Sequence, residues 1–189
     1  DMRSGLERLA YAALIVVVAT LVGWVVAMAV NLRPENFPHL ALTPLVYMLL
    51  RLPASFCGVF GFSIMFNSTP KMAALAGLIG AVANTTRLEL VDLAQIPAGP
   101  AAFVGAMIAG LLAWIVKRKV RYPQISITVP SIVIMVPGLY MYRAMYNIGL
   151  TSISVGALWL TKALLIVIFL PLGLITARII TDTKWRHNG

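Results

Sequence analysis

Four basic residues stand inside or at the edge of long apolar segments: Arg51, Arg87, Arg143 and Lys162. A Lys or Arg side chain at the centre of a membrane-spanning helix costs about 2.5–3.5 kcal/mol on insertion scales, so each one needs an explanation. One explanation is structural: these side chains snorkel to the membrane surface or pair with Glu89 and Asp92. The other is functional: they line an outward-open cavity that attracts a carboxylate, which the planar guanidinium of arginine can hold through two hydrogen bonds.

The fifth apolar segment carries a second unusual feature, a pair of prolines. Pro130 and Pro137 each lack a backbone N–H and clash with the preceding helical turn, and Gly138 permits unwinding directly after Pro137. Broken helices in a membrane are tolerated where they are buried or line a water-filled cavity, and in transporters they lie at the substrate. A simple proline kink is the structural alternative. Polar side chains follow this break at Tyr140, Tyr142, Arg143 and Asn147.

Two asparagines complete the set of candidate residues. Asn84 lies within the third apolar segment, where hydrogen bonding between helices is the structural alternative to a substrate contact. Asn67 stands near the end of the second segment, shortly before Pro70, where it could end a helix. The candidate substrate-binding residues are therefore Arg143, Arg51, Tyr142, Tyr140, Pro137, Gly138, Asn84, Arg87, Asn67 and Lys162.

Residues suited to catalysis or metal binding are scarce. The two histidines, His39 and His187, fall in predicted loops, and Cys57 is the only cysteine. The sequence contains no nucleophile–base pair and no phosphate-binding glycine loop. We therefore expect no catalytic residue, no metal ligand and no cofactor, and the chain is not expected to be an enzyme. All acidic residues lie at or near predicted helix ends, so a buried proton relay is expected to come from another chain or domain.

The composition indicates what must position these residues. The chain is 60% hydrophobic and 11% charged, whereas soluble domains carry about 25% charged residues. Residues 9–30 contain no charge, and about 20 apolar residues suffice for a helix to cross a membrane. We predict an all-α, polytopic transmembrane helix bundle whose fifth helix is broken at Pro137-Gly138. Its spans, about six, are expected near residues 9–30, 41–66, 71–88, 99–118, 125–147 and 153–180.

Membrane topology explains the net charge of +9 better than nucleic-acid binding does. The basic residues stand between apolar runs and not on a soluble face with stacking aromatics, so no nucleic-acid partner is expected. Six spans place ten of them on one side, including the cluster in residues 117–121. The positive-inside rule then predicts that both termini are cytoplasmic. In this topology Arg51, Arg87, Arg143 and Lys162 all fall in the outer half of the membrane.

Two motifs resemble the threonine/serine exporter family, specifically its C-terminal domain. They are GFSIMFNSTPKMA at residues 61–73 and SIVIMVPGLYMYRAMYNIG at residues 131–149. A similar domain is the small subunit of two-component exporters, one of which is linked to succinate export. The resemblance covers about residues 45–180. Phe66, Asn67 and Pro70 match the first motif, and Pro137, Gly138, Tyr142 and Arg143 match the second.

The resemblance implies proton-driven export of threonine and serine, or of a dicarboxylate such as succinate, across a bacterial inner membrane. It also implies a partner, because the N-terminal half of such exporters is a second transmembrane domain or subunit. The segment before residue 41 departs from the small-subunit pattern. We therefore expect an N-terminal transmembrane helix and loop at residues 1–40 and an exporter-like transmembrane domain at residues 41–189. A homo-oligomer is a further option.

Two other functions remain open on the sequence alone. A six-span substrate-binding subunit of an energy-coupling-factor vitamin importer has a similar size and number of spans. Such a subunit would bind its vitamin tightly alone and dock on ATPase partners. A non-transporting assembly or anchor protein is the other alternative. It would direct its four outer basic side chains towards lipid headgroups and would have no cavity.

Overall fold

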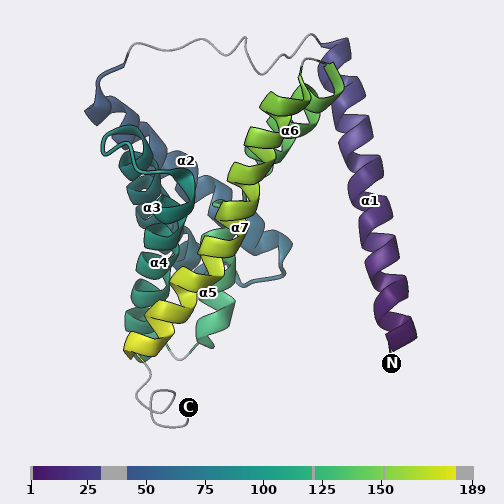
Figure 1. Cartoon of the computed structure of the whole chain (residues 1–189). Helices are drawn as coiled ribbons and strands as arrows, with labels where there is room; N and C mark the ends of the chain where they lie inside the picture. Colours follow the sequence, from purple (N-terminus) through teal and green to yellow (C-terminus); the bar gives the residue numbers. More distant parts are fainter. Residues whose placement is uncertain (1, 31–41, 121, 151, 182–189) are drawn as a thin grey trace. The chain divides into compact units, whose positions relative to one another are not determined.

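The computed structural model describes residues 2–30, 42–120, 122–150 and 152–181, and every regular element in these ranges is an α-helix. The chain forms two compact units, Asp1–Ala41 and Leu42–Gly189, which are described separately. Seven helices follow one another along the chain (Figure 1): α1 (Met2–Ala29), α2 (Pro44–Met65), α3 (Pro70–Asp92), α4 (Ala98–Val120), α5 (Gln124–Val133), α6 (Gly138–Leu150) and α7 (Ile153–Thr181).

The first unit consists of the single long helix α1. Large apolar side chains are exposed along most of its length, among them Leu14, Leu21 and Val25. A helix that exposes this many large apolar side chains suits lipid better than water. Within α1 the stretch Val17–Ala29 is apolar but shorter than a full span. The presence of a sixth span at residues 9–30 therefore stays a prediction.

The second unit is a bundle of helices long and apolar enough to cross a membrane. Five stretches meet these criteria of length and composition, and the fourth of them, Gln124–Gly149, contains both α5 and α6. The predicted all-α polytopic bundle is thus confirmed. One boundary differs clearly, because α3 continues to Asp92 although its apolar run ends near Leu88. Its polar last turns remain helical because they pack and pair with α2, as described below.

Proline and asparagine set the connection between α2 and α3. Pro70 occupies the first turn of α3 after Thr69, a position where its missing N–H costs no intrahelical hydrogen bond. Asn67 follows the last helical residues of α2 with a φ of 59°. Asparagine tolerates this left-handed conformation better than most residues. Asn67 therefore ends the second helix, as its place in the sequence indicates.

Small residues allow the helices of the second unit to pack closely. Its core contains six fully buried alanines of α3 and α4, namely Ala76, Ala83, Ala102, Ala106, Ala109 and Ala113. A Cβ added at Gly80 would stand 2.5 Å from Val59 Cγ2 and 2.9 Å from the Ser131 carbonyl oxygen. Small residues promote such close contacts in membranes, where the hydrophobic effect does not drive helices together. The neighbours in space include α2 with α3, α3 with α4 and α5, α4 with α7, and α6 with α7.

The fifth apolar segment is broken where the sequence predicts. Helix α5 ends at Val133 and α6 begins at Gly138, so residues 134–137 form a non-helical connection. Figure 1 shows α5 and α6 as two separate ribbons. The expectation that Pro130 also interrupts the helix is wrong, because Pro130 is buried inside α5 and the helix continues past it. A proline removes a single backbone hydrogen bond there, and the Ser131 hydroxyl anchors this turn to α3 by donating to the Ala76 carbonyl across 3.1 Å.

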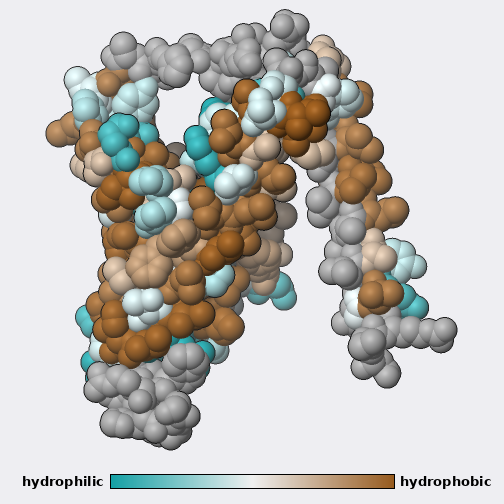
Figure 2. Space-filling view, in the orientation of Figure 1, coloured by the Kyte–Doolittle hydropathy of each residue, from teal (hydrophilic) through white to brown (hydrophobic). Residues whose placement is uncertain are grey.

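Charge separates the two ends of the second unit. Its basic end carries Lys71, Lys117, Arg118, Lys119 and Arg178, all near helix termini. The opposite end carries Glu89 and Asp92, close to the end of α3. On the face of the second unit seen in Figure 2, hydrophobic residues cover the flanks of the helices, and hydrophilic residues gather towards their ends. Exposed apolar flanks of this kind indicate contact with lipid.

Candidate functional site

The break between α5 and α6 is held by a basic side chain of another helix. Arg87 Nη1, on α3, donates a hydrogen bond to the carbonyl oxygen of Met135 across 3.0 Å. Met135 is fully buried and lies in the connection that follows α5. Helix ends leave carbonyl groups without an intrahelical partner, so a guanidinium is a favourable neighbour there. Two sequence-predicted features, Arg87 and the break, therefore meet in the structure.

Three buried polar atoms on the same stretch of α3 lack a hydrogen-bond partner. They are Arg87 Nε, Asn84 Oδ1 and Thr85 Oγ1. Asn84 stands one turn before Arg87 on the same face of the helix, whereas Thr85 points to another face. Asn84 and Thr85 are each 5% exposed. The amide nitrogen of Asn84 donates to the Ser55 hydroxyl of α2 across 2.9 Å, which leaves its oxygen as an acceptor. Buried polar groups are nearly always paired, so a cluster of unpaired ones indicates a place for water or a ligand.

Helix α4 closes this stretch of α3 through a glycine. A Cβ at Gly105 would stand 3.1 Å from Arg87 Cβ and 3.2 Å from Met135 Sδ. Such distances are tighter than ordinary van der Waals contacts, so any side chain at this position would press on Arg87 or on the break. Gly105 thus fixes how closely α4 approaches the site.

A second cluster assembles around Trp159 of α7. The Arg143 guanidinium lies 4.7 Å and the Lys162 ammonium 4.8 Å from the centre of the Trp159 ring. Tyr140 packs against the same ring with 5.7 Å between centroids. Each cation gains about 0.5–2 kcal/mol from such a contact. Tyr140 also packs against the core cluster that contains Met135, so it connects the helix break to Trp159.

Arg51 is held by acidic partners and not by this assembly. Its Nη1 pairs with Glu89 Oε1 at 2.7 Å, and its Nη2 pairs with Asp92. The guanidinium also lies 5.4 Å from the centre of the Tyr47 ring. These residues line a pocket of about 400 Å³, which lies at the end of the second unit that carries Glu89 and Asp92 and not at its basic end. A substrate carboxylate would have to displace one of these acids to reach Arg51.

The other candidate residues divide into two groups. Pro137 is buried at the break and Gly138 begins α6 beside it. Tyr142 packs on Tyr146, with 6.3 Å between ring centroids, within α6. Asn67 lies elsewhere, because 14 residues of α3 separate Pro70 from Asn84, a distance of about 21 Å at the helical rise of 1.5 Å per residue. The structure therefore does not bring Asn67 to the break.

The parts of the chain that the structure describes contain no cluster of residues that could hold a metal ion. No three His, Cys, Asp or Glu residues come together in the way that a metal ion requires. The residues at the break can instead donate and accept hydrogen bonds, and Arg87 adds a positive charge. This arrangement fits recognition of a polar anion better than bond-making chemistry.

The family model described as "Threonine/Serine exporter, ThrE" matches residues 51–180. This match covers more than half of the chain and includes both motifs and the helix break. The chain belongs to the threonine/serine exporter family. The resemblance inferred from the two motifs is confirmed, and the family is one of membrane transporters.

One relative matches much of this chain, and its description names no substrate. A protein of Haemophilus influenzae, described as uncharacterized, is 27% identical over 139 aligned residues. The aligned region covers 66% of this chain and 44% of the relative. The chain thus spans less than half of that protein's length. No solved structure matches the chain significantly.

Sequence reasoning about this exporter-family chain missed Trp159 and Gly105. Trp159 stands three residues before Lys162 on the same helix, and residues at this spacing share a helix face, so a signal was present. Gly105 is one of several small buried residues of α4, and its residue type alone does not distinguish it from the others. Its contact with Arg87 and Met135 joins residues from α3, α4 and the break, and no local pattern in the sequence encodes that meeting.

Proposed function

We propose that this chain is the domain or subunit of a secondary exporter that binds small carboxylate-bearing solutes, with threonine and serine as the first candidates and a dicarboxylate such as succinate as the next. Family membership supports the transporter class. The observation that carries the proposal is the contact of Arg87 with the helix break, next to unpaired buried polar atoms. Basic charge inside a membrane protein is costly and marks substrate pathways.

In this proposal Arg87 binds the substrate carboxylate. One guanidinium nitrogen, Nη1, donates to the Met135 carbonyl, and Nε has no hydrogen-bond partner. A carboxylate accepts hydrogen bonds from a guanidinium in a fixed planar geometry. The first turn of α6 adds to the attraction, because helix N-termini at a break carry partial positive charge.

An acceptor group nearby favours an amino acid over a dicarboxylate. Asn84 Oδ1, one helical turn from Arg87 on the same face of α3, is buried without a donor. The ammonium group of threonine or serine would donate to such an oxygen, as would the hydroxyl of either side chain. A dicarboxylate has no comparable donor and would require a second cation. Arg143 or Lys162, which both contact the Trp159 ring, would be candidates for it.

Proton coupling and a partner belong to the same proposal. The acids of the second unit in the described ranges are Glu89 and Asp92, and both pair with Arg51. A further transmembrane domain or subunit, corresponding to the N-terminal half of the exporter, would then supply the proton relay. We place the complex in a bacterial inner membrane with both termini in the cytoplasm.

Efflux from loaded cells tests the proposal. Cells that express the complete transporter are loaded with labelled threonine, serine or succinate, and efflux is followed with and without a protonophore. We expect efflux of at least one of these solutes that stops when the proton gradient collapses. Efflux of none of them, together with tight binding of a vitamin by the purified chain, would contradict the proposal and favour the vitamin-importer alternative.

A further inference from the structure

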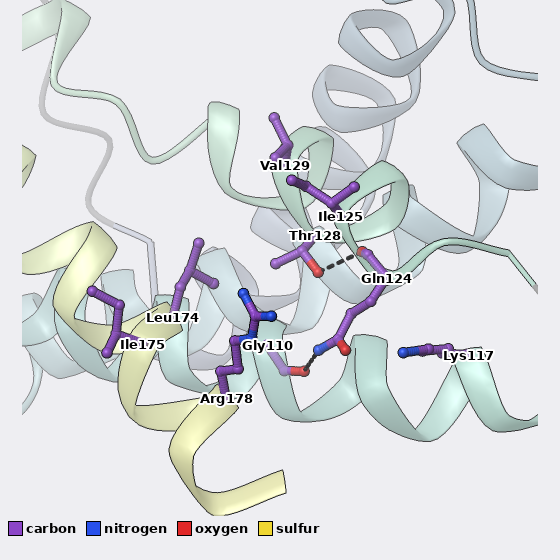
Figure 3. Close-up of a pocket in the computed structure, with 9 residues that line it drawn as sticks. All are labelled: Gly110, Lys117, Gln124, Ile125, Thr128, Val129, Leu174, Ile175 and Arg178. Atoms are coloured by element: carbon purple, nitrogen blue, oxygen red, sulfur yellow. Dashed lines mark hydrogen bonds between the residues drawn. The ribbon is translucent and has the colours of Figure 1, made fainter. Parts of the chain in front are cut away.

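A pocket at the basic end lies apart from the residues discussed so far. It has a volume of about 450 Å³ and lies between the last turns of α4 and α7 and the first turns of α5 (Figure 3). Its polar lining residues are Lys117, Gln124, Thr128 and Arg178. The helix break and the Trp159 cluster contribute no residue to it. The pocket is therefore independent of the proposed substrate site.

Positive charge converges on this pocket from three elements. Lys117 comes from α4 and Arg178 from α7, and Figure 3 shows the Lys117 ammonium directed towards the Gln124 side chain. The first residues of α5, Gln124 and Ile125, line the pocket too. Pro123, which precedes α5, provides no side-chain cap, so the helix N-terminus offers backbone N–H groups and a partial positive charge.

Two hydrogen bonds shape the polar wall of the pocket. The Gln124 amide nitrogen contacts the Gly110 carbonyl at 3.5 Å, and the Thr128 hydroxyl donates to the Gln124 carbonyl across 2.7 Å. These contacts hold the polar wall of the pocket in place. The wall as a whole presents donors and positive charge, which an anion complements.

The remaining wall of the pocket is apolar and open to the surroundings. Ile125 is 70%, Val129 42% and Ile175 43% exposed. These side chains extend from the basic end along the flank of α5 and α7, in the direction of the membrane interior. A small soluble anion would gain nothing from such a flank. A lipid would place its headgroup at the bases and its acyl chains along the apolar residues.

We propose that this pocket binds the phosphate of an anionic phospholipid from the leaflet on the basic side of the membrane. Lys117, Arg178 and the N-terminus of α5 hold the phosphate, and Ile125, Val129 and Ile175 contact the acyl chains. Basic pockets between transmembrane helices on the cytoplasmic side are typical sites for such lipids. Basic residues are generally favourable near helix C-termini, and this alone would explain Arg118 and Lys119. It does not explain why an apolar wall lies beside Lys117 and Arg178.

Lipid retention by the purified protein tests this assignment. The full chain is extracted with phosphatidylglycerol and phosphatidylcholine in equal amounts, and the retained lipids are compared by native mass spectrometry. We expect the double variant Lys117→Gln/Arg178→Gln to lower the ratio of phosphatidylglycerol to phosphatidylcholine by about tenfold, because each base near the surface contributes a several-fold preference. The single variant Lys117→Gln should give an intermediate ratio, and it serves if the double variant does not fold.

The matched control removes the same charge outside the pocket. The variant Arg118→Gln/Lys119→Gln should retain phosphatidylglycerol as the natural chain does. An equal loss in this control would show a general charge effect and overturn the pocket assignment. An unchanged ratio in Lys117→Gln/Arg178→Gln would also overturn it. Release of the bound lipid by inorganic phosphate or succinate would assign the pocket to a soluble anion and overturn the lipid assignment.

Discussion

Arg87 of α3 donates a hydrogen bond to the carbonyl oxygen of Met135, 3.0 Å away, in the connection between α5 and α6. This contact joins two features that are unusual in a membrane for different reasons. Arg87 brings a charge, and the connection brings backbone groups without helical partners. Each lowers the cost of the other, and Arg87 Nε remains without a hydrogen-bond partner in the described structure.

The Trp159 cluster provides a first prediction. We expect Arg143→Ala to abolish efflux while the protein still inserts in the membrane, because the sequence predicts Arg143 as a substrate-binding residue and the structure places it with Tyr140 against the Trp159 ring. The measurement is efflux of labelled threonine, with protein quantity in the membrane determined by immunoblot. A variant that transports normally would exclude Arg143 from the pathway.

Trp159→Leu separates the role of the ring from that of the charges. This substitution keeps an apolar side chain but removes the contacts of the ring with Arg143, Lys162 and Tyr140. We expect a partial loss of efflux, several-fold and smaller than that of Arg143→Ala, since cation–π contacts contribute only about 0.5–2 kcal/mol. A complete loss would mean that Trp159 itself contacts the substrate.

The Arg51–Glu89 ion pair yields a prediction about stability. The two side chains are 20% and 17% exposed, so removing one partner leaves the other poorly solvated. We expect Glu89→Gln to lower the melting temperature of the purified chain, and Arg51→Gln/Glu89→Gln to lower it by less than the sum of the single variants. Calorimetry or fluorescence-detected unfolding measures this. Strictly additive effects would show that the pair has no net coupling, and would contradict its role in keeping the polar last turns of α3 helical.

Gly105 links packing to the site. We expect Gly105→Ala to reduce efflux several-fold with a small loss of stability, because the new methyl group would stand 3.1 Å from Arg87 Cβ and 3.2 Å from Met135 Sδ. Overpacking in a well-packed core costs about 1–3 kcal/mol. Gly61→Ala is the matched control, since nothing lies within 4 Å of an added Cβ there. Equal effects of the two variants on efflux would contradict the proposed role of Gly105.

The sequence predicted the positions of the helices because the apolar runs are long and the breaks are chemically explicit. Pro137-Gly138 identified the end of α5 and the start of α6 almost to the residue. Pro130 was misjudged, because proline alone does not show whether neighbouring groups compensate for its missing N–H. The third helix was predicted too short, since polar residues such as Glu89 remain helical when a partner such as Arg51 pairs with them.

The site itself could be predicted only as a set of residue types. The sequence singled out Arg87 and Arg51 for the same reason, a charge within an apolar segment. Their hydrogen-bond partners distinguish them, because Arg51 donates to two carboxylates and Arg87 donates to a backbone carbonyl. These contacts join residues 38 to 48 positions apart in the chain. They depend on how α3 packs on its neighbours, which hydrophobic periodicity does not encode.

Replacement of Arg87 by Gln and by Lys tests the central claim most directly. Glutamine keeps a donor for the Met135 carbonyl but removes the charge, and lysine keeps the charge but removes the planar fork. Loss of a charged hydrogen bond costs about 1.5–3 kcal/mol, which is roughly ten- to hundredfold in affinity. The measurement is efflux of labelled threonine together with the shift in melting temperature that threonine causes in the purified chain.

We predict that Arg87→Gln loses at least about tenfold in efflux and the stabilisation by threonine, while the chain without threonine unfolds close to its natural temperature. Arg87→Lys should retain part of both. Lys119→Gln, an exposed base at the other end, should behave as the natural chain does. Normal efflux and normal stabilisation by threonine in Arg87→Gln would contradict the account and leave Arg87 as a support for the end of α5.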